Sequence, residues 1–83
     1  MADEALDWSE VATEDIQHDL AMTLADIPKL RDEAWIAGEM DFAEGMRREL
    51  VKRNAPLPVA CAWVFDPYAR GRMRLTYQLE ESQ

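Results

Sequence analysis

Residues 27–54, IPKLRDEAWIAGEMDFAEGMRRELVKRN, form the central segment of this chain. Pro28 suits the first turn of a helix, where its missing N–H leaves no bond unmade, and Asp26 precedes it as an N-cap. Gly38 is typical of a C-terminal stop, because glycine tolerates a positive φ. A first helix is therefore predicted here, with an apolar stripe at Leu30, Ala34 and Ala37 and with Trp35 at its edge.

A second helix is predicted in the other half of this stretch. Asp41 and Glu44 have the spacing of a capping box, and the apolar run that they open recurs every four residues, at Phe42, Met46 and Leu50. Residues 38–41 then form a turn between two antiparallel helices. The alternative is one unbroken helix over 28–53. Its two glycines would each cost up to about 1 kcal/mol relative to alanine, so we favour the helical hairpin.

Upstream of this stretch, the spacing predicts another helix over residues 14–25. Thr13 is a suitable N-cap, and the helix must end before Pro28 because the residue before a proline avoids the helical region. Its apolar stripe is Ile16, Leu20, Leu24 and Ile27. Residues 1–12 fit either a mobile arm or a short turn that Leu6 and Trp8 dock onto the body.

Residues 59–65 and 73–79 predict two strands. The turn between them, 66–72, contains Asp-Pro and Arg-Gly, so the pair forms an antiparallel β-hairpin. Residues 54–58 hold two prolines and predict a stiff linker.

The first strand is apolar on both faces. Simple alternation places Val59, Cys61, Trp63 and Phe65 on one face and Ala60, Ala62 and Val64 on the other. A strand of this kind is usually covered on both sides. One face should pack on the helices. The other predicts self-association into a larger sheet or strand addition to a target, unless residues 1–12 cover it.

These elements predict one small α+β domain over residues 1–83. Three helices in residues 14–53, the last two a helical hairpin, pack on the β-hairpin of residues 59–79, which dimerisation extends to a larger sheet. A chain of this length buries only about 60–65% of its unfolded surface, so dimerisation is a natural source of added stability.

Charge is unevenly spread along the chain. The net charge is −8; residues 1–50 hold 14 Asp and Glu against 4 Lys and Arg, whereas residues 51–83 hold 3 against 5. The acidic half repels nucleic acid and anionic membranes and attracts a basic surface. We therefore expect a larger, basic, nucleic-acid-handling protein as partner rather than nucleic acid itself.

Catalytic and metal-binding patterns do not stand out. His18 is the only histidine and lies off the apolar stripe, so metal-ligand spacing is missing. Cys61 lies in an apolar strand, where reactive cysteines are uncommon. No glycine-rich phosphate loop occurs. The sequence predicts a protein without catalytic activity, metal or cofactor.

Localisation follows from two further features of the sequence. A lone cysteine fits a reducing compartment, and no secretory signal or membrane-length apolar run is visible. We expect a cytoplasmic protein with no membrane partner.

Two candidate binding surfaces remain. Helical rows of carboxylates form an acidic face whose spacing is close to that of nucleic-acid phosphates, although such charges also serve simply to keep a small protein soluble. This face comprises Asp3, Asp7, Glu10, Glu14, Asp15, Asp19 and Asp26. The hairpin offers a surface for a partner or for self-association, comprising Trp63, Tyr68, Arg70, Arg72 and Arg74.

The resulting hypothesis is a non-enzymatic inhibitor that occupies a basic nucleic-acid-binding partner. In size and charge the chain is similar to small acidic phage-encoded inhibitors of host defence, including anti-CRISPR proteins; this likeness is one of class and rests on no motif. Two alternatives are a homodimeric regulatory or antitoxin-like protein that touches DNA through the loop around Arg70–Arg74, and a small structural subunit of a larger assembly.

Overall fold

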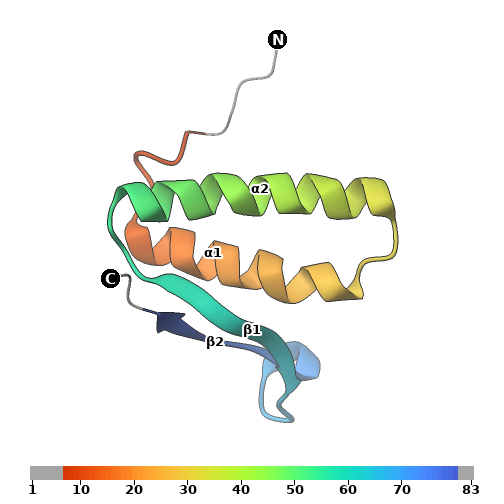
Figure 1. The fold of residues 1–83 in the computed structure, drawn as a ribbon. Coiled ribbons are helices and arrows are strands. Elements are labelled where there is room, and N and C mark those ends of the chain that lie inside the picture. Colours follow the sequence, from red (N-terminus) through yellow and green to blue (C-terminus); the bar gives the residue numbers. More distant parts are fainter. Residues whose placement is uncertain (1–6, 81–83) are drawn as a thin grey trace.

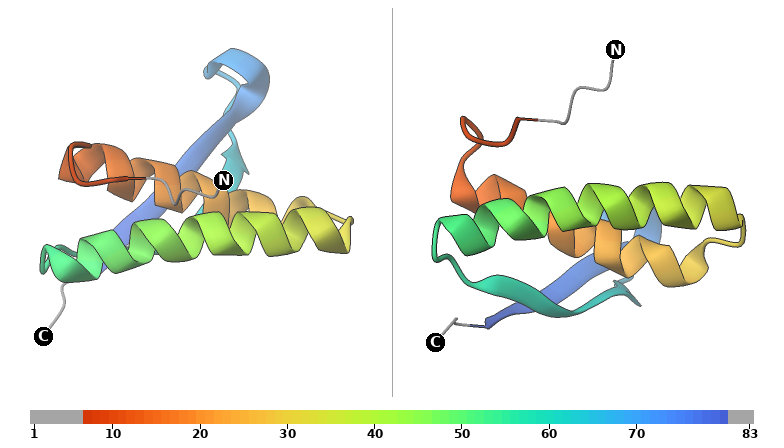
Figure 2. Two further views of the ribbon diagram at one scale, coloured as in Figure 1. Left: turned by 90° about the horizontal axis from the view of Figure 1, so that it is seen from above. Right: turned by 45° about the horizontal axis from the view of Figure 1, so that its top comes forward.

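The computed structural model describes residues 7–80 and shows an α+β fold (Figure 1). Helix α1 lies in the middle of the molecule, with the long helix α2 on one side and the β-hairpin on the other (Figures 1 and 2). The elements are α1 (Thr13–Asp26), the 3-10 turn η1 (Ile27–Lys29), α2 (Glu33–Lys52), β1 (Leu57–Phe65), the 3-10 turn η2 (Arg70–Arg72) and β2 (Met73–Glu80).

Helix α1 confirms the predicted helix over residues 14–25. Ile16 and Leu20 of its apolar stripe are buried. Ala12 rather than Thr13 occupies the N-cap position, and no side chain caps this end. Pro28 does not open a new helix as predicted. It lies in the 3-10 turn η1, which directly follows α1 and prolongs its end by one turn. Pro28 therefore belongs to the end of the first helix and not to the start of the second.

The predicted turn at Gly38–Asp41 is wrong, because α2 runs without interruption from Glu33 to Lys52. The described chain therefore has two α-helices rather than three. The turn lies earlier, where Asp32 accepts hydrogen bonds from the backbone N–H groups of Ala34 (2.9 Å) and Trp35 (3.3 Å). This cap satisfies two backbone N–H groups at the start of α2 that have no acceptor within the helix. The face that an unbroken α2 packs against α1 outweighs the cost of its two interior glycines.

Gly38 lies inside α2 with open space where a Cβ would stand. We therefore expect Gly38→Ala to raise the free energy of unfolding by about 0.5–1 kcal/mol, since alanine loses less backbone entropy in a helix. Urea unfolding measures the change. Gly45→Ala is the comparison, because its new Cβ would lie 3.4 Å from the Trp8 indole nitrogen. This variant should gain less stability than Gly38→Ala. A loss of stability in Gly38→Ala would contradict a continuous α2.

Helix α2 ends in a Schellman motif. Asn54 adopts a left-handed conformation with φ 60°. Its N–H donates to the Val51 carbonyl, and the Ala55 N–H donates to the Leu50 carbonyl, both at 2.9 Å. These bonds satisfy the last carbonyls of the helix and turn the chain toward β1.

The hairpin is antiparallel, as predicted, but β1 contains a bulge. Trp63 pairs with Leu75, whereas Val59 pairs with Gln78, and the register shifts between Val59 and Ala62. Leu75 and Gln78 are three residues apart and so face opposite sides of the sheet. The prediction that Val59 shares a face with Trp63 is therefore wrong, because the bulge reverses the alternation.

The predicted linker over residues 54–58 is also too long. Strand β1 begins at Leu57 and includes Pro58, which is buried and pairs with Leu79. Pro58 is tolerated there because β1 is an edge strand of a two-stranded sheet.

The core lies between the two helices and the start of β1. It consists of Ile16, Leu20, Ala43, Met46, Leu50 and Ala55, with Trp8, Val11 and Leu57 packed against it. Trp8 also stacks at a tilt on Phe42, with ring centroids 5.5 Å apart. Of the two structures that the sequence left open for residues 1–12, the described part, from Asp7 onward, is docked on the body. Asp3 and Leu6 lie outside the described residues.

Candidate functional site

Helix α1 carries four carboxylates and no lysine or arginine. Glu14 and Asp15 are exposed, and Asp19 is half-buried. None of these three makes an ion pair with another of the described residues. Their negative charge is therefore offered to solvent instead of being neutralised within residues 7–80.

The carboxylates that α1 contributes to the predicted acidic face lie on two sides of the helix. Asp15, Asp19 and Asp26 follow steps of four and seven and so share one side of α1, whereas Glu14 is turned about 100° away from Asp15. The Oδ1 atom of Asp26 accepts a 2.6 Å hydrogen bond from the Trp63 indole N–H. Asp26 thus helps to hold β1 against the end of α1, which leaves Asp15 and Asp19 as the centre of the acidic face.

The remaining residues of the predicted acidic face precede α1 in the sequence. The Oδ1 atom of Asp7 accepts a 3.0 Å hydrogen bond from the Ser9 N–H. Backbone and side-chain hydrogen bonds with Ser9 lower the pKa of Asp7, so this carboxylate stays ionised in mild acid. Glu10 is exposed in the turn before α1.

The arginines of the predicted hairpin surface lie together at the loop end of the hairpin. Arg74 pairs with Asp66 at 3.1 Å, but Arg70 and Arg72 make no ion pair among residues 7–80. Tyr68, beside them in the loop, is 96% exposed. The structure therefore brings the predicted loop residues together at one tip. Trp63, predicted with them, is half-buried and bonded to α1 instead.

An apolar groove between the helices and β1 was not predicted. It has a volume of about 460 Å³ and is lined mainly by Leu20, Leu24, Met40, Ala43, Leu57 and Val59, with Glu44, Arg47 and Glu80 among its polar residues. Met40 is 56% exposed there. The stripe position of Leu24 hints at this surface, but the groove exists only because β1 and α2 flank α1 without closing over it.

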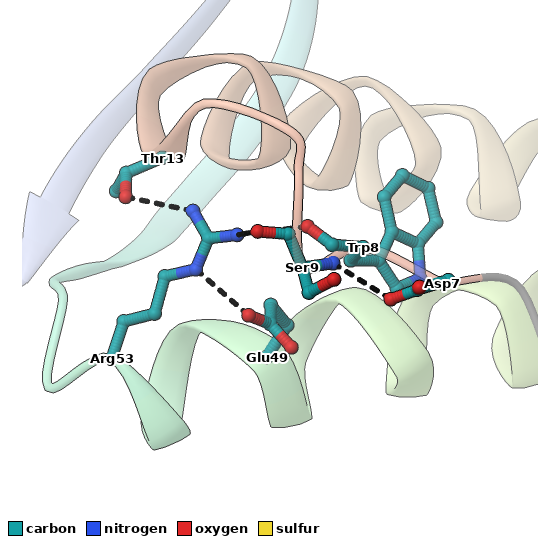
Figure 3. A network of polar contacts seen from close by, with 6 residues as sticks. All are labelled: Asp7, Trp8, Ser9, Thr13, Glu49 and Arg53. Carbon is teal, nitrogen blue, oxygen red and sulfur yellow. Dashed lines mark hydrogen bonds and ion pairs between the residues drawn. The ribbon is translucent and has the colours of Figure 1, made fainter.

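A second unpredicted feature is the hydrogen-bond network of Arg53 at the end of α2 (Figure 3). Its guanidinium donates to Glu49 Oε2 (2.8 Å), to Thr13 Oγ1 (2.9 Å) and to the carbonyl oxygens of Trp8 (2.8 Å) and Ser9 (3.3 Å). These bonds fasten the segment before α1 to α2. Four of the five N–H donors of the guanidinium are thus engaged within the chain, so the network serves to hold the fold together.

Side chains that could take part in catalysis or bind a metal lie apart from one another in the described residues. Exposed His18 lies edge-on to Tyr77, with ring centroids 6.3 Å apart. In the part of the chain that the structure describes, no three metal-binding side chains come together, and no helix has the length and apolarity to cross a membrane.

Cys61 is half-buried in β1, and burial raises the pKa of its thiol. Because only the thiolate reacts readily, we expect alkylation by iodoacetamide at pH 8 to be several times slower in the folded chain than in urea. The rate should keep rising with pH beyond the range in which a free cysteine levels off. Mass spectrometry of timed samples measures both rates; equal rates would contradict a protected thiol.

Comparisons with protein-family models, with curated proteins and with solved structures give no match for this chain.

Proposed function

We propose that this protein is a non-enzymatic interaction module whose acidic α1 face binds a basic surface of a larger, nucleic-acid-handling protein and blocks it. The observation that carries the proposal is the exposed charge of α1, where Glu14, Asp15 and Asp19 meet no cation among the described residues. An inhibitor of the small acidic phage-encoded kind, which includes anti-CRISPR proteins, is the class that fits this surface.

The arrangement of α1 supports this use. Asp15 and Asp19 are one helical turn apart, about 6 Å along the axis, which is a spacing that a row of lysines or arginines in a phosphate-binding groove can follow. The helix lies on a folded body, so binding does not require the chain to order itself first. Charge complementarity of this kind speeds association and falls with added salt.

The test starts by capturing the partner from the native cell and purifying it. Titration calorimetry should then show binding that weakens steadily as salt rises. The double variant Asp15→Asn, Asp19→Asn should bind about ten-fold more weakly, given 0.2–1 kcal/mol for each exposed charge contact. The matched control, Glu33→Gln with Glu39→Gln, removes the same charge from α2.

Two results would overturn the proposal. One is binding that does not change with salt. The other is equal weakening in both double variants, which would mean that net charge rather than the α1 face matters. A competition assay adds the inhibitory step: the captured protein should lose its nucleic acid as this chain is added.

A second function is favoured by the hairpin tip, where Arg70 and Arg72 stand without carboxylate partners in the described chain beside an exposed tyrosine. In this case the protein is a dimeric regulator that touches DNA. It should shift a DNA probe at low salt, and Arg70→Ala with Arg72→Ala should abolish the shift. Arg47→Ala with Arg48→Ala removes the same charge from α2 and should leave the shift in place.

A further inference from the structure

Among the described residues, no strand pairs with the outer edge of β2. The sheet has two strands, and within residues 7–80 the backbone of β2 bonds to β1 alone. Figure 2 shows the hairpin crossing beside α1, with no further element running along β2. A row of unpaired N–H and C=O groups of this length is a template for another strand, and a two-stranded sheet is marginal in water.

The edge of β1 is blocked, whereas the edge of β2 is not. Pro58 removes one N–H from β1, and Ala60, at φ 55°, forms the bulge that disturbs the strand. Both features discourage pairing. Strand β2 contains no proline and no residue with positive φ from Met73 to Glu80. Added pairing is therefore directed to β2.

We propose that a second copy of this chain pairs with β2 in antiparallel fashion, about a two-fold axis at Tyr77. This register sets Arg74 opposite the partner's Glu80 and Leu75 opposite the partner's Leu79. Thr76 then meets the partner's Gln78. The two hairpins become one four-stranded sheet. The only charges on β2 are Arg74 and Glu80, at opposite ends and of opposite sign, so antiparallel pairing of two copies makes two ion pairs.

The faces of the sheet agree with this register. Leu75 pairs with Trp63, and Tyr77 lies beside His18, so Leu75 and Tyr77, in the middle of β2, face the helices. Leu79, on the same face, is 46% exposed in the single chain. Pairing about Tyr77 covers it with the partner's Leu75. A slip of one residue would set apolar side chains against polar ones across the sheet.

A register centred on Thr76 keeps the faces but loses the ion pairs. Arg74 would then meet the partner's Gln78, and Glu80 would meet the partner's Arg72, which lies outside β2 in a left-handed conformation (φ 67°). Charge therefore selects Tyr77 as the centre. The dimer rests on the edge of β2 and is independent of the acidic-face proposal.

Disulfide trapping tests the register. In a Cys61→Ala background, single cysteines are placed as Thr76→Cys, Tyr77→Cys and Gln78→Cys and exposed to mild oxidant. Only the residue on the axis faces its own copy, at about the 4.5–5.5 Å Cα separation of a paired position, which a disulfide can span. Tyr77→Cys should cross-link fastest. Faster trapping of Thr76→Cys, or no trapping at any position, would overturn the proposal; circular dichroism checks that each variant is folded.

A charge swap tests the ion pairs. Sedimentation velocity should show dimers of the natural chain, and Arg74→Glu should raise the dimer dissociation constant about ten-fold, because both symmetric pairs become repulsive. Glu80→Arg should act alike, and the double swap should restore the dimer. The double swap does not restore the ion pair between Arg74 and Asp66 within one chain. Recovery of the dimer in this variant therefore reports the contact between the two copies.

Two results would overturn the pairing: a natural chain that stays monomeric up to about 1 mM, beyond the range of even weak specific interfaces, or a double swap that fails to recover.

Discussion

Leu50→Ala is expected to lower the free energy of unfolding by about 3 kcal/mol, because it removes three buried carbons and leaves a cavity. Leu50 is fully buried in the cluster with Ile16, Leu20 and Met46. It is contributed by α2 at the point where both helices and the start of the hairpin meet, so the site cannot collapse without moving several elements. For a chain of this size the loss is a large part of the total stability.

Urea unfolding followed by circular dichroism measures this effect. Val51→Ala is the matched control, since Val51 is the next residue of α2 but is 53% exposed; it should cost less than about 1 kcal/mol. Equal losses at the two positions would mean that the core does not lie on this side of α2.

Arg53→Ala should cost about 2–3 kcal/mol, because it removes the hydrogen bonds of several part-buried acceptors as well as a charge. The side chains of Arg53 and Glu49 are only 21% and 15% exposed. Without the guanidinium, the Glu49 carboxylate loses its counter-charge and the Ser9 carbonyl loses its bond from Arg53, while the Trp8 carbonyl keeps only the bond from the Val11 N–H. The segment before α1 should then detach from α2.

Two comparisons make this prediction sharp. Arg53→Lys keeps the charge but cannot reach four acceptors from two directions, so it should lose most of the same stability. Arg48→Ala removes a 75% exposed partner of Glu44 and should cost under about 0.5 kcal/mol. Faster amide hydrogen exchange at Val11, whose N–H donates to the Trp8 carbonyl at 3.0 Å, would report the detached segment. Unchanged exchange in Arg53→Ala would contradict the role of the Arg53 network in holding this segment.

Local periodicity was enough for α1 and for β2. Ile16 and Leu20 repeat at helical spacing and are buried, and the alternation of Leu75 and Tyr77 marks the inner face of β2. These patterns survive because each element buries one side against a neighbour, which is the condition under which periodicity is informative.

The turn between α1 and α2 was misplaced because two local signals competed. Gly38 looks like a helix stop and Pro28 like a helix start, but the Asp32 cap and the packing face of α2 decide the outcome. A glycine in a helix costs about 1 kcal/mol, which is less than the burial of Ala43, Met46 and Leu50 provides. The bulge at Ala60 was missed for a similar reason, since nothing in an apolar run marks where alternation reverses.

For the candidate surfaces, local sequence is enough to say which charges exist and on which side of a helix they lie. Asp15 and Asp19 needed no tertiary information, because their spacing alone places them one turn apart. Three features follow from tertiary contacts: Asp26 accepts a hydrogen bond from Trp63, Arg53 binds the segment before α1, and no other strand of the described residues pairs with the outer edge of β2. Each of these depends on residues 37 or more positions apart or on strand neighbours, and contacts of that kind leave no mark in local spacing.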